Sequence, residues 1–232
     1  MQVVILAGGL GTRLKDHGLR TPKSMVPVGG RPFISYLLEQ CRLAGVSNVL
    51  VLTGHLAEPL EEYLQTQAIV NGRVTCVRDD PPRGTGAALK GAASQLAETF
   101  VLMNGDTLVD VDLRDVYEKM NDETDLLLVV SPAGRGPLVE VANVMYTADG
   151  RVAAYQKGAG SHPYTHIEAG ISVLRRHAVE TLGDHAASLE LDLYPALAAT
   201  GRCRGYETLA SVFDIGTPER IHALERALRS WS

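Results

Sequence analysis

Residues 3–32 read VVILAGGLGTRLKDHGLRTPKSMVPVGGRP, and this stretch indicates the fold of the chain. Its apolar run ends at Leu6 and breaks into glycines, which is typical of a parallel β-strand buried on both faces. Glycines after a buried strand permit positive φ angles and bring backbone N–H groups close to an anion. The same loop then carries two separated cations, Arg13 and Lys23. We therefore expect a buried strand followed by a loop that can wrap a triphosphate.

Two familiar phosphate-binding loops do not fit this stretch. The dinucleotide pattern G-x-G-x-x-G fails because Leu14 follows Gly9 and Gly11 where a third glycine is needed. The Walker pattern fails because no Gly-Lys-Ser/Thr follows the glycines. The next expected helix begins only at residue 31, so no helix N-terminus directly receives the phosphates. An NAD-binding oxidoreductase is therefore disfavoured.

The composition is that of an ordinary soluble globular protein. The chain has 232 residues, of which 45% are apolar, and no repeat or linker divides it, so we treat residues 1–232 as one domain. Its 22 basic and 27 acidic residues give a net charge of −5, spread without blocks, which argues against non-specific nucleic-acid binding. No apolar run approaches the roughly 20 residues that span a bilayer, so no membrane partner is expected. The glycines after Leu6 also argue against a signal peptide.

The cysteine pattern indicates the compartment. Cys41, Cys76 and Cys203 lie far apart in apolar surroundings. This predicts three buried thiols in a reducing environment, with neither a disulfide framework nor a zinc site. The expected location is the cytoplasm.

Strands and helices alternate through the first half of the chain. The expected strands cover residues 1–6, 48–54, 73–77 and 99–106. The expected helices cover residues 31–44, 58–65 and 85–97. Pro32 is expected in the first turn of the first helix, where proline is well tolerated. This alternation predicts an α/β, Rossmann-like fold with a mostly parallel sheet and helices on both faces.

After residue 106 the rhythm changes to that of a mixed sheet. The expected strands cover residues 125–130, 138–146, 151–156, 166–174 and 204–207, with a hairpin turn at 148–150. The expected helices cover residues 113–120, 175–182 and 189–199, and a last helix starts at Pro218 after its cap Thr217. We expect this half to add a wall to a site built by the first half.

Several motifs, in order along nearly the whole chain, resemble those of the sugar-1-phosphate nucleotidylyltransferases. LAGGLGTRL at 6–14 and PKSMVPVGGRP at 22–32 are similar to the family patterns L-A-G-G-x-G-T-R-L and P-K-P-x-x-P-V. The further landmarks are RGTGAAL at 83–89, LMNGD at 102–106, EAGISVL at 168–174 and FDIGTPE at 213–219. The tail over 188–221 is similar in layout to that of the short D-glycero-D-manno-heptose 1-phosphate guanylyltransferases. The resemblance implies a single GT-A-like nucleotidyltransferase domain.

The resemblance also implies a reaction. A nucleotidyl group would pass from an NTP to a sugar-1-phosphate with Mg²⁺ as cofactor, giving an NDP-sugar and pyrophosphate; the narrower similarity points to GTP and a heptose-1-phosphate. A phosphate monoester has a second pKa of about 6 and is already largely dianionic, so no general base is required. The protein must instead offset the repulsion between two polyanions, which calls for a metal ion, cations and backbone N–H groups.

The family's charged residues can be carried over to this chain. Asp106 and Asp214 would hold Mg²⁺, which commonly takes one or two carboxylates. Arg13 would bind the β- and γ-phosphates and the leaving pyrophosphate, and Lys23 would contact the α-phosphate and the incoming sugar phosphate. Lys157 would hold the phosphate of the sugar. Arg13, Lys23 and Asp106 are thus the expected catalytic residues.

The resemblance implies two binding regions, about 1–110 for the nucleotide and about 111–232 for the sugar phosphate. The expected nucleotide-binding residues are Leu6, Ala7, Gly8, Gly9, Gly11, Thr12, Arg83, Gly84, Thr85, Asn104 and Gly105. The expected sugar-phosphate-binding residues are Asn143, Lys157, Glu168, Ala169 and Gly170. Carboxylates and amides suit sugar hydroxyls because they accept or share several hydrogen bonds.

The chain departs from the family pattern at several positions. Ser24 replaces the proline after Lys23, and Gln156 and Gly158 replace the Glu and Pro around Lys157. Arg83 stands where an apolar residue is common, and it could stack on or pair with the base.

Alternatives stay open at this point. Asp214 could pair with a surface arginine, and Lys157 could be an ordinary hairpin charge. The same reaction could use UTP or CTP with a hexose or aminosugar phosphate, or the chain could be a silent nucleotide-sugar sensor. The oligomeric state is open, a homodimer included.

Overall fold

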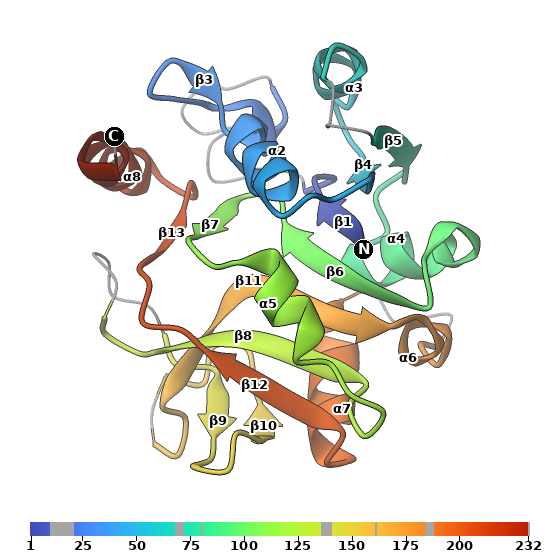
Figure 1. Ribbon diagram of the computed structural model, residues 1–232, viewed down its shortest axis with the longest axis vertical. Helices are drawn as coiled ribbons and strands as arrows, with labels where there is room; N and C mark the ends of the chain where they lie inside the picture. The colour runs from blue at the N-terminus through green and yellow to red at the C-terminus, as the bar shows by residue number, and fades with distance from the viewer. Residues whose placement is uncertain are drawn as a thin grey trace.

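The computed structural model describes residues 1–9, 21–67, 72–79, 81–135, 141–160, 162–183 and 188–231. Its central feature is a nine-stranded mixed sheet within these ranges (Figure 1). The strands run in the order β10-β9-β11-β6-β1-β4-β5, with β8 paired to β11 and β12 paired to β8. The expected α/β fold with a mixed central sheet is confirmed.

The first half of the chain builds the parallel part of the sheet. β1 (Gln2–Leu6) lies between β4 (Asn48–Thr53) and β6 (Thr99–Asn104), and β5 (Arg73–Arg78) lies outside β4. Leu6 is in register with Leu52 on one side and Asn104 on the other. The carboxyl ends of the central strands therefore meet at one edge, where ligands bind in open α/β sheets.

The second half is largely antiparallel. β11 (His166–Arg175) pairs with β6 and joins the two halves. The other strands of this half are β8 (Leu126–Pro132), β9 (Val144–Tyr146), β10 (Val152–Tyr155) and β12 (Cys203–Glu207). A separate ribbon of β7 (Thr107–Val109) and β13 (Val212–Asp214) crosses from one half to the other.

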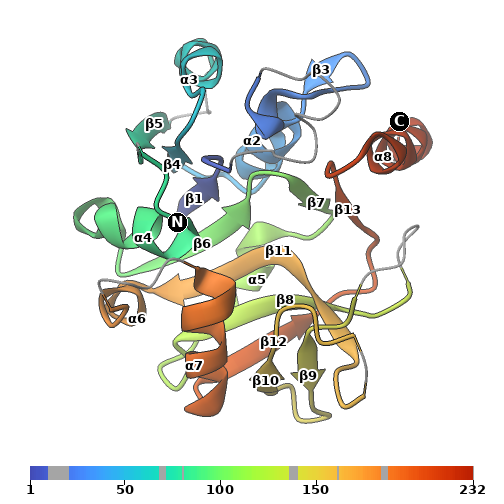
Figure 2. The same ribbon diagram turned by 180° about the vertical axis from the view of Figure 1, so that it is seen from behind.

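Two apolar cores lie on the two faces of the sheet. Because side chains alternate along a strand, Val3 and Ile5 belong to one core and Val4 to the other. The first core is covered by α2 (Ile34–Leu43), α3 (Glu58–Gln65), α5 (Leu113–Glu118) and α8 (Pro218–Trp231). The second is covered by α4 (Thr85–Gly91), α6 (Arg176–Glu180) and α7 (Tyr194–Ala199). The prediction of helices on both faces is confirmed (Figures 1 and 2).

The first helix starts later than the sequence pattern predicts. Residues Arg31–Pro32 form β3, which pairs with β2 (Pro27–Val28), so the prediction of Pro32 in the first helical turn is wrong. The turn between them uses Gly29 and Gly30, both with positive φ, as a two-residue hairpin turn requires. This hairpin replaces the expected first turn of the helix.

Other element bounds differ more modestly. The expected helix at 85–97 is divided into α4 and the 3₁₀ turn η2 (Ala93–Gln95). The expected helix at 189–199 begins with a π turn, η3 (Leu189–Leu193), before α7. Residues 138–140 of the expected strand at 138–146 fall outside the described ranges, and of its described residues 141–146 only β9 is a strand.

The prediction of three buried thiols is wrong at one position. Cys41 and Cys203 are each 0% exposed, but Cys76 is exposed. Cys76 lies on β5, the edge strand, which is covered less completely than the central strands. In the described part of the chain, no helix is both long and apolar enough to cross a bilayer.

Candidate active site

A cleft of about 720 Å³ opens where the central strands end, between the two halves of the sheet. It runs from the ends of β1 and β6 to β11, η3 and the start of α8. The residues expected from the sequence that line it are Leu6, Ala7, Gly8, Gly9, Lys23, Gly84, Thr85, Asn104, Gly105, Asp106, Asn143, Lys157, Glu168, Gly170 and Asp214. Gly11, Thr12 and Arg13 lie outside the described residues.

Two expected residues are not part of the cleft lining. Ala169 is 0% exposed, because alternate residues of β11 face the cleft and the core. Arg83 turns to Asp79: its Nε donates to Asp79 Oδ1 at 2.7 Å and its backbone N–H donates to Oδ2 at 2.9 Å. Asp79 itself is buried and lines the cleft. Arg83 therefore shapes the cleft through Asp79, and its contact with a base stays a prediction.

The glycines of the first loop serve different purposes. A Cβ on Gly8 would lie 3.2 Å from the backbone carbonyl carbon of Thr53, so the close approach of the segment after β1 to the end of β4 favours glycine there. A Cβ on Gly9 would meet nothing within 4 Å. Gly9 is exposed at the cleft, and its missing side chain leaves room for a ligand beside the backbone.

Two carboxylates distant in the sequence meet at the β7–β13 ribbon. Asp106 stands immediately before β7, and Asp214 ends β13 opposite Thr107. The backbone N–H of Ile215 donates to the carbonyl oxygen of Asp106 at 3.1 Å. The ribbon therefore brings Asp106 and Asp214 to the same side of the cleft.

Each of these carboxylates forms an ion pair. Lys23 Nζ contacts Asp106 Oδ2, and Arg220 Nη1 contacts Asp214 Oδ2. The point where a Cβ on Gly216 would lie is 2.7 Å from Asp214 Oδ1, 3.8 Å from Lys23 Nζ and 3.9 Å from Arg220 Cδ. Lys23, Asp106, Asp214 and Arg220 thus form one charged cluster, and the alternative that Asp214 pairs with an arginine is realised inside the cleft.

The carboxylate pair suits Mg²⁺ in its donor chemistry. The side chains of Asp106 and Asp214 are 37% and 18% exposed, so both can reach a ligand in the cleft. Among the described residues, no three His, Cys, Asp or Glu side chains converge on one point as a complete metal site. Mg²⁺ typically uses one or two carboxylates and fills its other positions with phosphate oxygens and water. The pair therefore fits a metal that arrives with a phosphate.

The far end of the cleft carries a second charged group. Lys157 Nζ forms an ion pair with Glu190 of η3, and both side chains line the cleft. Asn143 Oδ1 accepts from the backbone N–H of Glu168 at 2.9 Å. Glu168 Oε1 accepts from the backbone N–H of Gly170 at 2.7 Å. Two groups of contacts therefore line the wall at this end of the cleft: the Lys157–Glu190 ion pair, and the Asn143 amide with the Glu168 carboxylate.

Two buried tyrosines lie behind this wall. The rings of Tyr155 and Tyr194 meet edge to face at 5.3 Å, and Tyr194 lines the cleft. Burial raises the pKa of both phenols, and the charges of Glu168 and Glu190 raise it further. Both hydroxyls therefore stay protonated. In the part of the chain that the structure describes, the Tyr155 hydroxyl has no hydrogen-bond partner.

Several cleft residues were not expected from the sequence. They are Ser24, Leu52, Thr53, Asp79, Pro82, Ala88, Thr107, Leu189, Glu190, Tyr194, Val212 and Arg220. Two of them carried a signal: Ser24 departs from the family pattern beside Lys23, and Arg220 directly follows the FDIGTPE motif. The Ser24 hydroxyl is buried and has no hydrogen-bond partner among the described residues.

Comparison with known proteins shows which family the chain matches. A family model described as the MobA-like NTP transferase domain matches residues 3–205. D-glycero-alpha-D-manno-heptose 1-phosphate guanylyltransferase of Aneurinibacillus thermoaerophilus is 29% identical, over 100% of both chains. Mannose-1-phosphate guanylyltransferase of Mycobacterium tuberculosis is also 29% identical; the match covers 94% of this chain but 62% of that protein.

Solved structures with a similar fold include two proteins complexed with a nucleotide or a nucleotide sugar. HddC from Yersinia pseudotuberculosis, complexed with GMP-PN, is 30% identical with a TM-score of 0.82, over 100% of this chain and 99% of that chain. A UDP-glucose pyrophosphorylase complexed with UDP-glucose matches with a TM-score of 0.82 at 17% identity, over 100% of this chain and 99% of that chain. At that identity the second likeness shows the fold alone.

Proposed function

The chain belongs to the MobA-like NTP transferase domain family, and from this premise we propose that it transfers a guanylyl group from GTP to a heptose-1-phosphate, giving a GDP-heptose and pyrophosphate. One observation carries the proposal. Asp106, Asp214 and Lys23 converge at the ends of the central strands, and Lys157 and Glu168 line the other wall of the same cleft. The cleft thus has separate charged ends for two phosphorylated substrates.

The proposed reaction needs no side-chain nucleophile. An oxygen of the sugar phosphate forms a bond to the α-phosphorus of GTP while the bond to the bridging oxygen breaks and pyrophosphate leaves with that electron pair. Lys23 would neutralise the α-phosphate, and Lys157 would hold the sugar phosphate against the repulsion between the two anions. Bound by Asp106 and Asp214, Mg²⁺ would supply the charge that offsets the triphosphate. Arg13 keeps its proposed role on the β- and γ-phosphates.

The remaining contacts would orient the two substrates. Gly8 and Gly9, with Gly84 and Thr85, would frame the base and ribose. Glu168 would accept hydrogen bonds from sugar hydroxyls, supported by Asn143 and Gly170 on the same wall. The nucleotide would therefore bind mainly to residues 1–110 and the sugar phosphate mainly to residues 111–232.

The choice of base and sugar rests on relatives. The Aneurinibacillus protein that matches over 100% of both chains is named a heptose 1-phosphate guanylyltransferase, and HddC was solved with GMP-PN. The Mycobacterium relative is a guanylyltransferase named for mannose-1-phosphate, but this chain spans 62% of its length. These relatives favour GTP, and the full-length match favours the heptose. The three free cysteines support a reducing compartment such as the cytoplasm.

A pyrophosphate-release assay tests the proposal. Purified protein is given GTP, UTP, CTP, ATP or dTTP, each crossed with heptose-, mannose-, glucose- and aminosugar-1-phosphates in Mg²⁺. We expect the highest kcat/KM with GTP and D-glycero-D-manno-heptose 1-phosphate. A higher value with mannose-1-phosphate would reject the heptose while keeping the guanylyl transfer. Binding of GDP-sugar without turnover on any pair would reject the enzyme in favour of a sensor.

A further inference from the structure

Charges that could bind phosphate are already engaged within the cleft. Lys23 pairs with Asp106 and Arg220 pairs with Asp214, while a further lysine–glutamate pair closes the far end. All of these side chains line the cleft. Among the described residues, each lysine or arginine of the lining therefore faces a carboxylate of the same lining. A triphosphate must replace such carboxylates as the partners of these cations.

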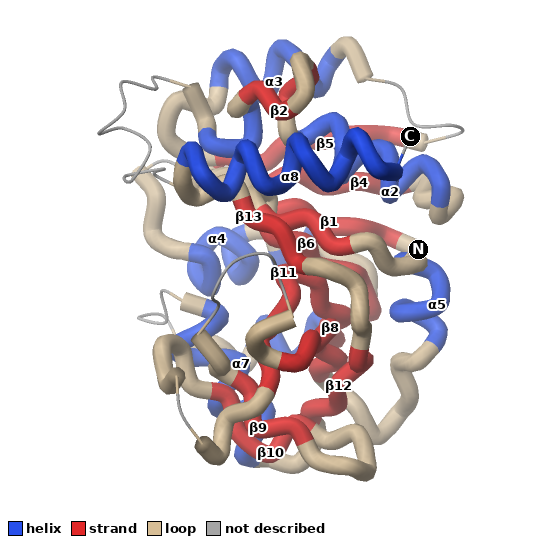
Figure 3. The backbone as a smooth tube through the Cα atoms, turned by 90° about the vertical axis from the view of Figure 1, so that its left-hand side faces the viewer, coloured by secondary structure: helices blue, strands red, loops and turns tan. Residues whose placement is uncertain are grey.

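Arg220 lies in the first turn of α8. Its backbone N–H lies 3.4 Å from Thr217 Oγ1, the cap of α8. Further along α8, Glu225 Oε1 accepts from the backbone N–H of Gly29 at 3.0 Å, which ties the helix to the hairpin after Lys23. Figure 3 shows α8 lying beside β13. The backbone of Arg220 is thus held in place, while its long side chain, 27% exposed, can exchange one partner inside the cleft for another.

The two oxygens of Asp214 are engaged in unequal ways. Oδ1 accepts from the backbone N–H of Gly216 at 2.7 Å, a bond set by the local chain geometry. Oδ2 faces the guanidinium of Arg220, which stands at the end of a long side chain with rotatable bonds. A divalent cation at Asp214 needs one oxygen. Oδ2 is the oxygen that can be released without moving the backbone.

We propose that Arg220 is a further phosphate-binding residue of the transfer reaction, and that without nucleotide it occupies the metal-binding oxygen of Asp214. The inference rests on the proposed function and deepens it. A guanidinium released from Asp214 finds the phosphates of the nucleotide next to Lys23, since Lys23 Nζ and Arg220 Cδ both lie within 4 Å of one point beside Asp214. Its planar donors match phosphate oxygens in pairs. Metal and nucleotide therefore bind cooperatively. The nucleotide draws Arg220 away from Asp214 and so frees the carboxylate for the metal, while the metal at Asp214 frees Arg220 for the phosphates.

Arg220→Met tests both parts of the inference, since methionine keeps the aliphatic stem and removes the charge. Mn²⁺ is the metal probe, followed by its paramagnetic resonance signal in nucleotide-free protein. We expect Mn²⁺ to bind roughly threefold more tightly in the variant, because its competitor at Asp214 is gone. GTP affinity at saturating Mg²⁺, measured by calorimetry, is expected to fall about tenfold or more, because a charge-assisted hydrogen bond to phosphate is lost.

Arg226→Met is the matched control, because Arg226 is exposed on the same helix and the change in charge is identical. It should leave both affinities as in the wild type, and thermal unfolding of both variants checks their folding. Opposite shifts in Arg220→Met support the inference. Weaker binding of both Mn²⁺ and GTP would mean that Arg220 merely orients Asp214, and unchanged GTP affinity would reject phosphate binding; either result overturns the inference.

The same titrations separate this inference from the function it rests on. Metal-dependent GTP binding by the wild type, with unshifted affinities in Arg220→Met, rejects the inference alone. Absence of metal-dependent GTP binding by the wild type rejects the proposed function and the inference together.

Discussion

Asp106 shows how much of the proposed chemistry depends on a single side chain. It stands between β6 and β7, pairs with Lys23 and lies on the same side of the cleft as Asp214. Its 37% exposed carboxylate can be reached from the cleft without any change in the core. A conservative substitution there should therefore separate catalysis from folding.

Asp106→Asn removes the charge and keeps the shape. We expect kcat for pyrophosphate release to fall about 100-fold or more, since a preorganised electrostatic contact to the transition state is lost. Affinity for the GDP-sugar product, measured by calorimetry, should stay sizeable because the base and sugar contacts remain. Asp110→Asn is the control, since Asp110 is exposed nearby and does not line the cleft. Turnover close to wild type in Asp106→Asn would contradict the metal assignment.

Lys157→Met tests the proposed grip on the sugar phosphate. The KM for the sugar-1-phosphate should rise about tenfold, the loss expected for a hydrogen bond to a charged group. The KM for GTP should not change, because Lys157 lies on the opposite wall from Lys23. Lys119→Met, an exposed lysine on another surface, should leave both constants unchanged. A rise in the KM for GTP of equal size would show that Lys157 does not distinguish the two substrates.

Residues on strand ends were predictable, and residues from docked helices were not. Asp106 follows the apolar strand β6, and Glu168 lies near the start of β11, which runs antiparallel to β6, so both lie at the edge of the sheet where β6 ends. Glu190 and Arg220 enter the cleft from η3 and α8. Their positions depend on how η3 and α8 pack against the sheet, which the sequence pattern does not show. Strand alternation also indicates that Ala169 points away from the cleft, because its neighbours Glu168 and Gly170 line it.

At the scale of elements, the bend in β11 determines the wall of the cleft. Its pairing with β8 shifts register between Glu168 and Ser172. Gly170 has φ +79°, and a Cβ there would lie 2.7 Å from Thr107 Cβ. The bend therefore lets β11 pass directly against β7 and turns Glu168 toward the cleft.

Gly170→Ala should destabilise the fold by about 2 kcal/mol, because the added methyl meets Thr107 and a positive φ is strained for alanine. Urea unfolding measures the change. Gly183→Ala is the control: a Cβ there meets nothing within 4 Å, and its effect should stay within about 0.5 kcal/mol. Equal unfolding midpoints for the two variants would contradict this prediction, because they would show that β11 shifts enough to accommodate the added methyl group.

The start of α2 shows why short elements escape sequence patterns. Pro32 suits a first helical turn, but proline is equally tolerated on an edge strand such as β3. The Gly29–Gly30 pair was the available signal for a two-residue hairpin. Strands of two residues carry no periodicity, so only the turn could have revealed them.

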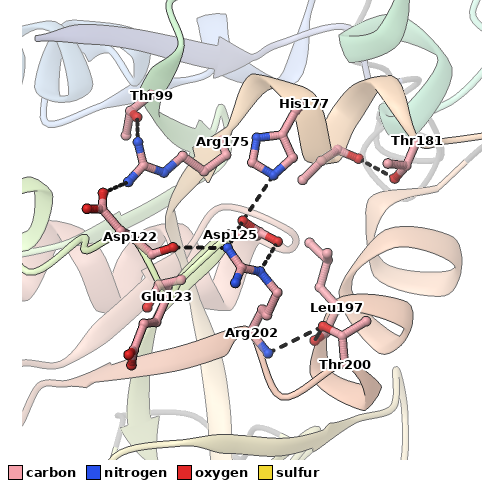
Figure 4. Close-up of polar contacts among 12 residues, drawn as sticks. Thr99, Asp122, Glu123, Asp125, Arg175, His177, Thr181, Leu197, Thr200 and Arg202 are labelled. Atoms are coloured by element: carbon pink, nitrogen blue, oxygen red, sulfur yellow. Dashed lines mark hydrogen bonds and ion pairs between the residues drawn. The ribbon is translucent and has the colours of Figure 1, made fainter.

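At the scale of the whole molecule, a polar network closes the end of the sheet away from the cleft (Figure 4). Asp125, just before β8, accepts from Arg202 Nε at 2.6 Å and lies 3.0 Å from His177 Nε2. Nearby, Arg175 donates to Thr99 at the other end of β11 from Glu168. The network ties β8, β12 and α6 together without contributing to the cleft lining.

Arg202→Met should therefore lower stability and leave kcat/KM unchanged. The side chain of Asp125 is 9% exposed, so removing its main partner should lower the free energy of unfolding at pH 7, measured with urea. Arg226→Met should cost less than about 0.5 kcal/mol. A loss of activity at 25 °C in folded Arg202→Met would contradict the view that the network around Asp125 stabilises the fold without affecting the cleft.

The same variant makes a prediction about pH. Hydrogen bonds from Arg202, aided by its charge and that of His177, hold the pKa of Asp125 below its usual range. A lowered carboxyl pKa stabilises the fold fully above the ordinary value of about 4, and this stabilisation is lost as pH falls through the folded pKa. Wild type and Arg202→Met should therefore differ most near neutral pH, and the difference should shrink as pH falls below about 4. A difference in unfolding free energy that does not change between pH 7 and pH 3 would contradict this account.

The exposed thiol on β5 has a practical consequence for spectroscopy. Cys41 and Cys203 are each 0% exposed, so Cys76 is the natural attachment point for a maleimide dye in the folded wild-type chain. Partial burial raises the pKa of the Cys76 thiol, so conjugation should speed up as the buffer is made more alkaline. Since β4, the neighbour of β5, contributes Leu52 and Thr53 to the cleft, a fluorophore on Cys76 could report nucleotide arrival without any engineered cysteine.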